Sequence, residues 1–328
     1  MTTVLADARR GHPGLFAFAL AMAVLTAVLA VLLVIDDRVL LGAPLWLKPL
    51  KFSISFVAYA GTLAWLLGRL RARRMQWAGW TIVAAATVEM TILVGQAARG
   101  VRSHFNTDTP FDANLFSIMG ATIVVLWLAT LAIALRFLRE PGSDRATATA
   151  VRLGLLVALL GLLEGFVIVA NGAHTVGLPD GGPGLPLVGW STTGGDLRIA
   201  HFVGMHALQA LPLLAAGLAA LRRFDDDARV GLVRVAGGAW AGLVVLVTWQ
   251  ALRAQPLLAP DATTLAAAAT LVAATVTAGA AVLLAGRRRA RAAAPGIDPT
   301  APDAAAPDAA APGVAAPGVA TAQPGAVG

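Results

Sequence analysis

The sequence predicts an all-α integral membrane protein, a polytopic bundle of about eight transmembrane helices with a Gly/Pro-rich exoplasmic lid loop. The 328 residues are 58% hydrophobic and only 13% charged, whereas a soluble chain carries about 25% charged residues. The apolar residues fall in runs of roughly 20, the length that crosses the hydrocarbon core of a bilayer. The lipid bilayer is therefore the expected partner of most of the surface.

Eight apolar runs are the predicted spans, and they place a transmembrane domain over residues 1–289. The first run is too long for a signal-peptide core and ends at Asp36 and Asp37 without a small-residue cleavage site, so we expect it to stay as an anchor. The last is built almost entirely from small residues and Val or Leu, which allow close helix packing in lipid. The spans are expected at 14–36, 50–70, 77–98, 115–138, 149–171, 198–221, 231–252 and 263–286.

The basic residues give the orientation. Eighteen of the 25 Lys and Arg residues fall on one side of the predicted membrane, and an excess of this kind marks the cytoplasmic side. With eight spans both termini are then cytoplasmic, in a plasma membrane. Because the positive charges sit in short runs between spans, the net charge of +7 indicates topology and not nucleic-acid binding. The eighteen are Arg9, Arg10, Arg69, Arg71, Arg73, Arg74, Arg136, Arg139, Arg145, Arg152, Arg222, Arg223, Arg229, Arg234, Arg287, Arg288, Arg289 and Arg291.

Residues 290–328 alternate Ala, Pro, Gly and Asp. A segment of this composition cannot bury enough apolar surface to fold. We expect a disordered cytoplasmic tail that carries no chemistry.

Polar side chains concentrate on the predicted exoplasmic side. Four of the five histidines belong to it: His104, His174, His201 and His206. Since a helix rises 1.5 Å per residue, Glu89 lies roughly 16 Å below the mouth of its span, and Glu164, His206 and Gln209 lie at related depths. A carboxylate near mid-bilayer costs several kcal/mol if it faces lipid. These groups are therefore expected to face one another.

The exoplasmic loops add further candidates. The loop 172–197 is the longest, and its Gly and Pro residues favour tight turns. Its Leu and Trp residues predict that it folds down on the bundle as a lid, in preference to a flexible linker. The residues expected to bind substrate are Gln96, Arg99, Asn106, Asp180, Asp196 and Gln209.

Lys48 and Lys51 are the only lysines in the chain. They lie three residues apart, on one face if the segment is helical. Together with Glu89 and Glu164 they are the candidate catalytic groups, either balancing a carboxylate or binding an anion. Pro49 between them suggests a bent or partly unwound entrance.

These residues predict a metal or haem site. The chain has no cysteine, so a metal would be held by His201, His206, His104 and His174 with carboxylate help, a set suited to iron, copper or zinc. A haem b would instead lie between His206 and a second histidine such as His104. The plainer reading is that these groups only hydrogen-bond one another to hold polar helices together.

Two functions stay open at this stage. The first is a membrane-embedded enzyme or redox protein with a metal or haem, acting on a small molecule or a quinone. The alternative is a proton-coupled transporter or permease for a small solute or ion, with Glu89, Glu164 and His206 as a relay. The cytoplasmic halves of the spans contain few polar side chains, and this asymmetry favours the one-sided enzyme site.

Overall fold

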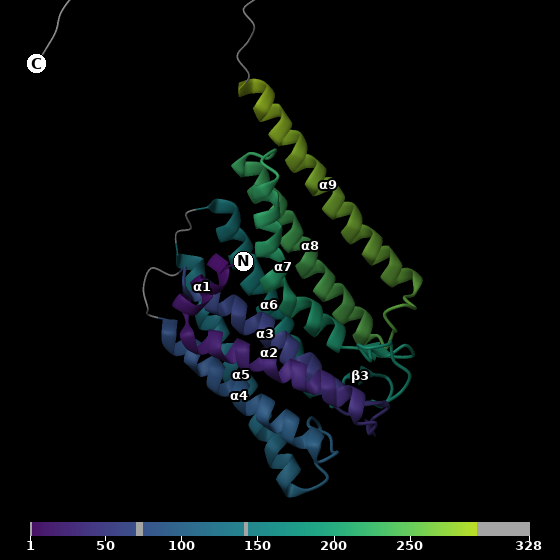
Figure 1. The fold of residues 1–328 in the computed structure, drawn as a ribbon. Helices are drawn as coiled ribbons and strands as arrows, with labels where there is room; N and C mark the ends of the chain where they lie inside the picture. The colour runs from purple at the N-terminus through teal and green to yellow at the C-terminus, as the bar shows by residue number, and fades with distance from the viewer. Residues whose placement is uncertain (1, 70–74, 141–143, 294–328) are drawn as a thin grey trace, which may run out of the picture.

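The chain forms an all-α bundle in a computed structural model that describes residues 2–69, 75–140 and 144–293 (Figure 1). Within these residues, eight helices are long and apolar enough to cross a membrane, which confirms the predicted fold class. A short additional helix precedes them. The helices are α1 (Thr2–Gly11), α2 (Pro13–Ile35), α3 (Leu47–Leu67), α4 (Gln76–Ala98), α5 (Pro110–Arg139), α6 (Arg145–Asn171), α7 (Arg198–Ala220), α8 (Asp226–Leu252) and α9 (Ala262–Ala293).

Helices α5 and α6 begin earlier than hydropathy alone predicts because polar caps set their first residues. Helix α5 starts at Pro110, five residues before the predicted span, because the Thr109 hydroxyl accepts a hydrogen bond from the Asp112 amide. The Asp144 carboxylate caps α6 in the same way through the Thr147 amide. Side-chain oxygens at this position satisfy amides that have no partner inside the helix.

Pro49 does not unwind the entrance to α3. It is the third residue of that helix, where the missing amide hydrogen would have had no partner in any case. The helix therefore starts at Leu47, three residues before the predicted span, and keeps Lys48 and Lys51 in its first turns.

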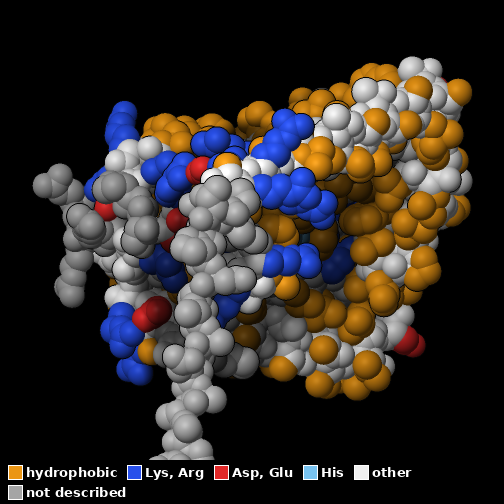
Figure 2. All heavy atoms as spheres, turned by 90° about the horizontal axis from the view of Figure 1, so that it is seen from above, with side chains coloured by type: hydrophobic (Ala, Val, Ile, Leu, Met, Phe, Trp, Pro, Cys, Tyr) orange, Lys and Arg blue, Asp and Glu red, His pale blue; other side chains and the backbone are white. Residues whose placement is uncertain are grey.

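The two ends of the bundle differ in chemistry. One end, here called the arginine end, has the first residues of α2, α4, α6 and α8 and the last residues of α3, α5, α7 and α9, and most of the arginines. Figure 2 looks onto this face, where Lys and Arg side chains gather. Arg71, Arg73 and Arg74 lie outside the described residues, as does the predicted tail beyond residue 293, whereas residues 290–293 complete α9.

The opposite end, here called the loop end, holds the longer connections. Two small antiparallel ladders form there: β1 (Val39–Leu40) with β2 (Ala43–Pro44), and β3 (Thr175–Val176) with β4 (Gly195–Asp196). The first ladder turns through Leu41 and Gly42, both at positive φ, as a two-residue hairpin requires. The second ladder ties the beginning of the loop 172–197 to its end.

Helices α6 and α7 approach each other closely through Gly161 and Gly204. A Cβ atom added to Gly161 would lie 2.4 Å from the amide nitrogen of Met205 and 2.6 Å from Cα of Gly204. Small residues allow this contact, which is how helices associate in lipid without a hydrophobic driving force. Helix α9 packs beside α8 at the edge of the bundle (Figure 1). The most apolar stretch of this helix has no buried residue.

The main apolar core fills the half of the bundle nearer the arginine end. It includes Leu15, Leu63, Leu66, Ile82, Ile133 and Leu155, all essentially inaccessible to solvent. The described buried polar residues lie in the other half, apart from His12, Thr130 and Glu140. His12 has a structural role, since its Nδ1 accepts from the Leu15 amide and its Nε2 donates to the Gln76 carbonyl.

Candidate functional site

Glu89 and Asp196 are the two most deeply buried acids of the loop-end half, and Glu89 is the one without an ion pair to an arginine. It lies on α4 with 1% of its surface exposed, and its nearest opposite group is Nε2 of His104, 3.7 Å from Oε1. Neither carboxylate oxygen accepts a hydrogen bond from the described residues. The Thr122 hydroxyl is close to Glu89, but it donates to the Met119 carbonyl. A buried carboxylate without a donor needs a proton or a ligand to offset its desolvation.

His104 connects Glu89 to the surface. It follows α4 in the loop 99–109, where Ser103 Oγ lies 3.0 Å from its Nδ1. Rings of Phe52, Phe105 and Phe116 surround the imidazole at centroid distances of 6.0, 6.5 and 6.1 Å. Burial, together with the positive charge of nearby Lys48, lowers the pKa of His104 well below its usual value. The ring is therefore neutral at pH 7, with one nitrogen able to donate and the other able to accept.

Lys48 supplies the positive charge at this site. It lies in the first turn of α3 and interacts electrostatically with Glu89, His104, His174 and Asp180. Because α3 begins at Leu47, Lys48 lies between the Glu89 carboxylate of α4 and the loop 172–197. Its ammonium is the counter-charge that Glu89 would otherwise lack.

Lys51, one turn further along α3, has a different partner. Its Nζ donates a 2.8 Å hydrogen bond to the Val188 carbonyl in the loop 172–197. The two lysines thus divide their roles: Lys48 faces the acid and histidine cluster, whereas Lys51 holds the long loop against the bundle.

His174 and Asp180 form a dyad inside the long loop. Asp180 Oδ2 accepts from His174 Nδ1 at 2.6 Å, and the carboxylate also accepts the amides of His174 and Thr175. These bonds lower the pKa of Asp180 despite its partial burial. Burial lowers the pKa of His174. A carboxylate only accepts, so Nδ1 carries the hydrogen and Nε2 keeps its lone pair. The His174 ring centroid lies 6.4 Å from that of His104.

His201 and His206 show the same tautomer on α7. His201 Nδ1 donates to the Gly161 carbonyl at 2.7 Å, and His206 Nδ1 donates more weakly to Gln209 Oε1 at 3.3 Å. The Gln209 amide in turn donates to the Ala58 carbonyl and the Thr62 hydroxyl on α3. Nε2 of both rings is therefore the nitrogen with the lone pair, as in histidines that bind a metal through Nε2.

The loop 172–197 is packed on the bundle as predicted. Arg198 pairs with buried Asp196 at 2.5 Å and donates to the Gly189 carbonyl, while Asp196 accepts the Ser191 amide. A Cβ atom on Gly195 would overlap the Ala251 carbonyl of α8. Asp196 thus anchors the loop. The loop contains His174 and approaches Lys48 and Lys51.

Several of the predicted site residues belong to other networks. Gln96 and Arg99 both donate to Asp112 at the start of α5, and Asn106 donates to the Arg102 carbonyl within its own loop. These contacts fasten the loop 99–109 to α5. The sequence analysis missed Asp112, although a Thr-Pro-x-Asp pattern before an apolar run is typical of a helix N-terminus.

Glu164 points towards α8. Thr248 donates to its Oε1 at 2.9 Å, and its buried Oε2 accepts no hydrogen bond from the described residues. The contacts of Glu164 therefore set it apart from the cluster around Glu89, and the expectation that all the buried polar groups face one another stays a prediction for this residue.

The predicted metal ligands do not come together as a set in the described residues. Within residues 2–69, 75–140 and 144–293, no three His, Asp or Glu side chains come together in a way that could hold a metal ion. Comparison with known proteins adds no family, because no family model, curated protein or solved structure matches the chain. The function must therefore be argued from the site itself.

Proposed function

We propose that the chain is a membrane-embedded enzyme or redox protein that acts on a small molecule at the loop end, with Ser103, His104 and Glu89 as a proton relay and Lys48 as its counter-charge. By the positive-inside rule the arginine end is cytoplasmic. The site then opens towards the exoplasmic side of a plasma membrane, with both termini in the cytoplasm.

One observation carries this proposal: buried Glu89 has no hydrogen-bond donor among the described residues and lies 3.7 Å from a histidine whose other nitrogen contacts a hydroxyl. A neutral imidazole can accept a proton at one nitrogen and release the other, so His104 can pass a proton between Ser103 and Glu89. Ionisable residues at this depth are usually functional because their burial is costly. The purely structural reading leaves the carboxylate oxygens of Glu89 without partners.

The apolar core supports a one-sided site over a transport path. Leu63, Leu66, Ile82 and Ile133 fill the bundle between Glu89 and the arginine end. A proton-coupled transporter needs polar groups on both sides of its binding site. Transport therefore remains the second candidate, to be tested by ion flux in liposomes.

A metal or haem cofactor beside the relay is the second part of the proposal. His174 and His201 present Nε2 lone pairs and fit a ligand role individually, although no three such ligands come together in the part of the chain that the structure describes. Such a group would supply electron transfer or polarise a substrate. A quinone is a suitable substrate class, since it dissolves in lipid and its oxygens take up and release protons.

The relay can be tested before any substrate is known. Infrared difference spectra of the full-length protein in detergent, recorded across a pH titration, should contain a carboxyl band that disappears in Glu89→Gln. The midpoint of this band should change in His104→Gln. Asp261→Asn is the matched control, because Asp261 is also at the loop end but pairs with Arg253 at 2.6 Å. A Glu89→Gln spectrum identical to wild type would refute the relay.

An optical spectrum and elemental analysis of the same preparations test the cofactor. A haem band, or near-stoichiometric iron, copper or zinc that is lost in His201→Gln, would identify the cofactor. A colourless, metal-free protein that keeps the Glu89 band would retain the relay and exclude resident haem and metal.

A further inference from the structure

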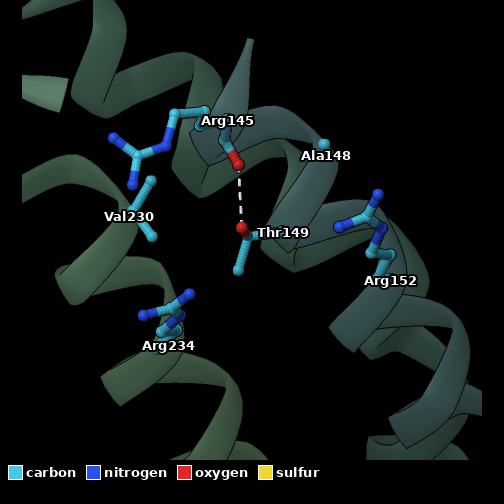
Figure 3. A pocket seen from close by; sticks show the side chains of 6 residues that line it. All are labelled: Arg145, Ala148, Thr149, Arg152, Val230 and Arg234. Atoms are coloured by element: carbon cyan, nitrogen blue, oxygen red, sulfur yellow. Dashed lines mark hydrogen bonds between the residues drawn. The ribbon is translucent and has the colours of Figure 1, made fainter. Parts of the chain in front are cut away.

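We propose that the arginine end contains a binding site for the phosphate of an anionic phospholipid, between α6 and α8. A pocket of about 170 Å³ opens there. Figure 3 shows its lining, with Arg145 and Arg234 on one side of the pocket and Arg152 on the other. The remaining lining residues are Ala148, Thr149 and Val230. This site is independent of the function proposed for the loop end.

Helical spacing brings these side chains together. Arg145, Thr149 and Arg152 follow one another at intervals of four and three residues, so they share one face of α6. Arg234 completes the pocket from α8, which packs against α6. The Thr149 hydroxyl donates to the Arg145 carbonyl at 2.7 Å, so the guanidinium groups are the donors that remain to bind an anion.

The pocket has more positive than negative charge. Arg145 pairs with Asp227 at 2.8 Å, but both side chains are more than half exposed. Arg152 donates through Nε and Nη2 to the Phe137 and Glu140 carbonyls, which hold the guanidinium in place without neutralising it. Arg234 makes no ion pair or hydrogen bond with any described residue. Like charges brought together in this way repel, and a bound anion would remove the repulsion.

Depth favours a lipid as the source of the phosphate. Arg152 is seven residues from the start of α6 and Arg234 is eight residues from the start of α8, so both lie roughly 10–12 Å along their helices. The two arginines therefore lie below the helix ends, at the level where lipid phosphates meet the hydrocarbon. Arginine binds phosphate oxygens in pairs through its planar fork, and basic pockets between spans at the cytoplasmic side typically bind anionic headgroups. Ala148 and Val230 offer apolar contact for the glycerol and the upper acyl chain.

The test is the thermal stability of the full-length protein in a neutral detergent with added lipid. Phosphatidylglycerol should raise the melting temperature of wild type in a saturable way, whereas phosphatidylcholine should not. Arg234→Gln should weaken the apparent affinity for phosphatidylglycerol about tenfold, as expected for one lost charge-assisted bond. This variant should fold normally, since Arg234 has no partner among the described residues. Arg223→Gln is the matched control, because Arg223 is at the same end and stacks on Phe224 outside the pocket.

Inorganic phosphate, added in place of lipid, distinguishes the two sources. A shift with phosphatidylglycerol alone, reduced in Arg234→Gln and kept in Arg223→Gln, supports the lipid site. An equal, Arg234-dependent shift with inorganic phosphate would support the phosphate site but assign it to a soluble ligand. A shift of the same size in wild type and Arg234→Gln, or no shift with either ligand, would overturn the proposal.

Discussion

Replacing Gly161 with alanine should separate α6 from α7 and disturb the site at the same time. The new Cβ would lie 2.4 Å from the Met205 amide nitrogen and 2.5 Å from the Gly204 carbonyl carbon. Ordinary contact begins at 3.4 Å, so one helix has to move by about 1 Å. The obstructing atoms are backbone atoms, which cannot turn away as a side chain could. The same movement would stretch the 2.7 Å bond from His201 to the Gly161 carbonyl.

The expected cost follows from these two effects. Overpacking a close contact costs about 2 kcal/mol, and loss of a neutral hydrogen bond adds about 1 kcal/mol. Together these two effects cost about 3 kcal/mol. The gain in helix propensity from Gly to Ala, about 1 kcal/mol, acts in the opposite direction, so Gly161→Ala should lower the free energy of unfolding by about 2 kcal/mol.

The assay is an SDS titration of the purified protein in mixed micelles, which gives the free energy of unfolding. Gly120→Ala is the matched control, because Gly120 lies inside α5 and a Cβ there would meet nothing within 4 Å. It should leave stability unchanged or raise it slightly. If Gly161→Ala proved as stable as Gly120→Ala, the close approach of α6 and α7 would be wrong.

Two further predictions concern the long loop. Lys51→Met removes the 2.8 Å hydrogen bond to the Val188 carbonyl, which is worth about 1.5 kcal/mol for a charged donor. Limited proteolysis of the loop 172–197 should therefore become about tenfold faster. Arg102→Met, which leaves that loop untouched, should not change the rate. Acidification should destabilise the loop end. The unfolded chain takes up a proton at His174 near the usual pKa of 6.5. In the folded chain the pKa of His174 is lowered, so the same proton is taken up only at a lower pH. Stability therefore falls as the pH drops below 6.5. Melting temperatures at pH 7.5 and 5.5 measure this loss, which should be smaller in His174→Gln.

The acid prediction has further consequences that can be checked. The lowered pKa of His104 acts in the same direction and in the same pH range, so His174→Gln should reduce the loss without abolishing it. The lowered pKa of Asp180 adds a second loss only below its usual value of 3.8. Stability that increased on acidification from pH 7.5 to 5.5 would contradict both histidine assignments.

The sequence by itself determined the membrane part of the structure. Runs of about 20 apolar residues must be helical in lipid because each backbone amide and carbonyl needs a partner within its own segment. The eight spans followed from this local rule. The asymmetry of arginine between the two ends came from the placement of charge along the sequence, and the packing of the Gly/Pro-rich loop came from its Leu and Trp residues. The same reasoning placed Glu89, His104, His174 and Lys48 at one end of the bundle.

The tertiary structure decided which of those polar groups meet. Helix depth fixes how far a residue lies from the membrane surface, but not the rotation of its helix or its neighbour. Glu164 and Glu89 lie at similar depths, yet Glu164 meets Thr248 on α8 and Glu89 meets His104. Gln96 and Arg99 both donate to Asp112, a partner that their depth did not indicate. The contact of Gly161 with Gly204 is likewise a tertiary feature, because it joins α6 to α7 through backbone packing and leaves no periodic signal in the sequence.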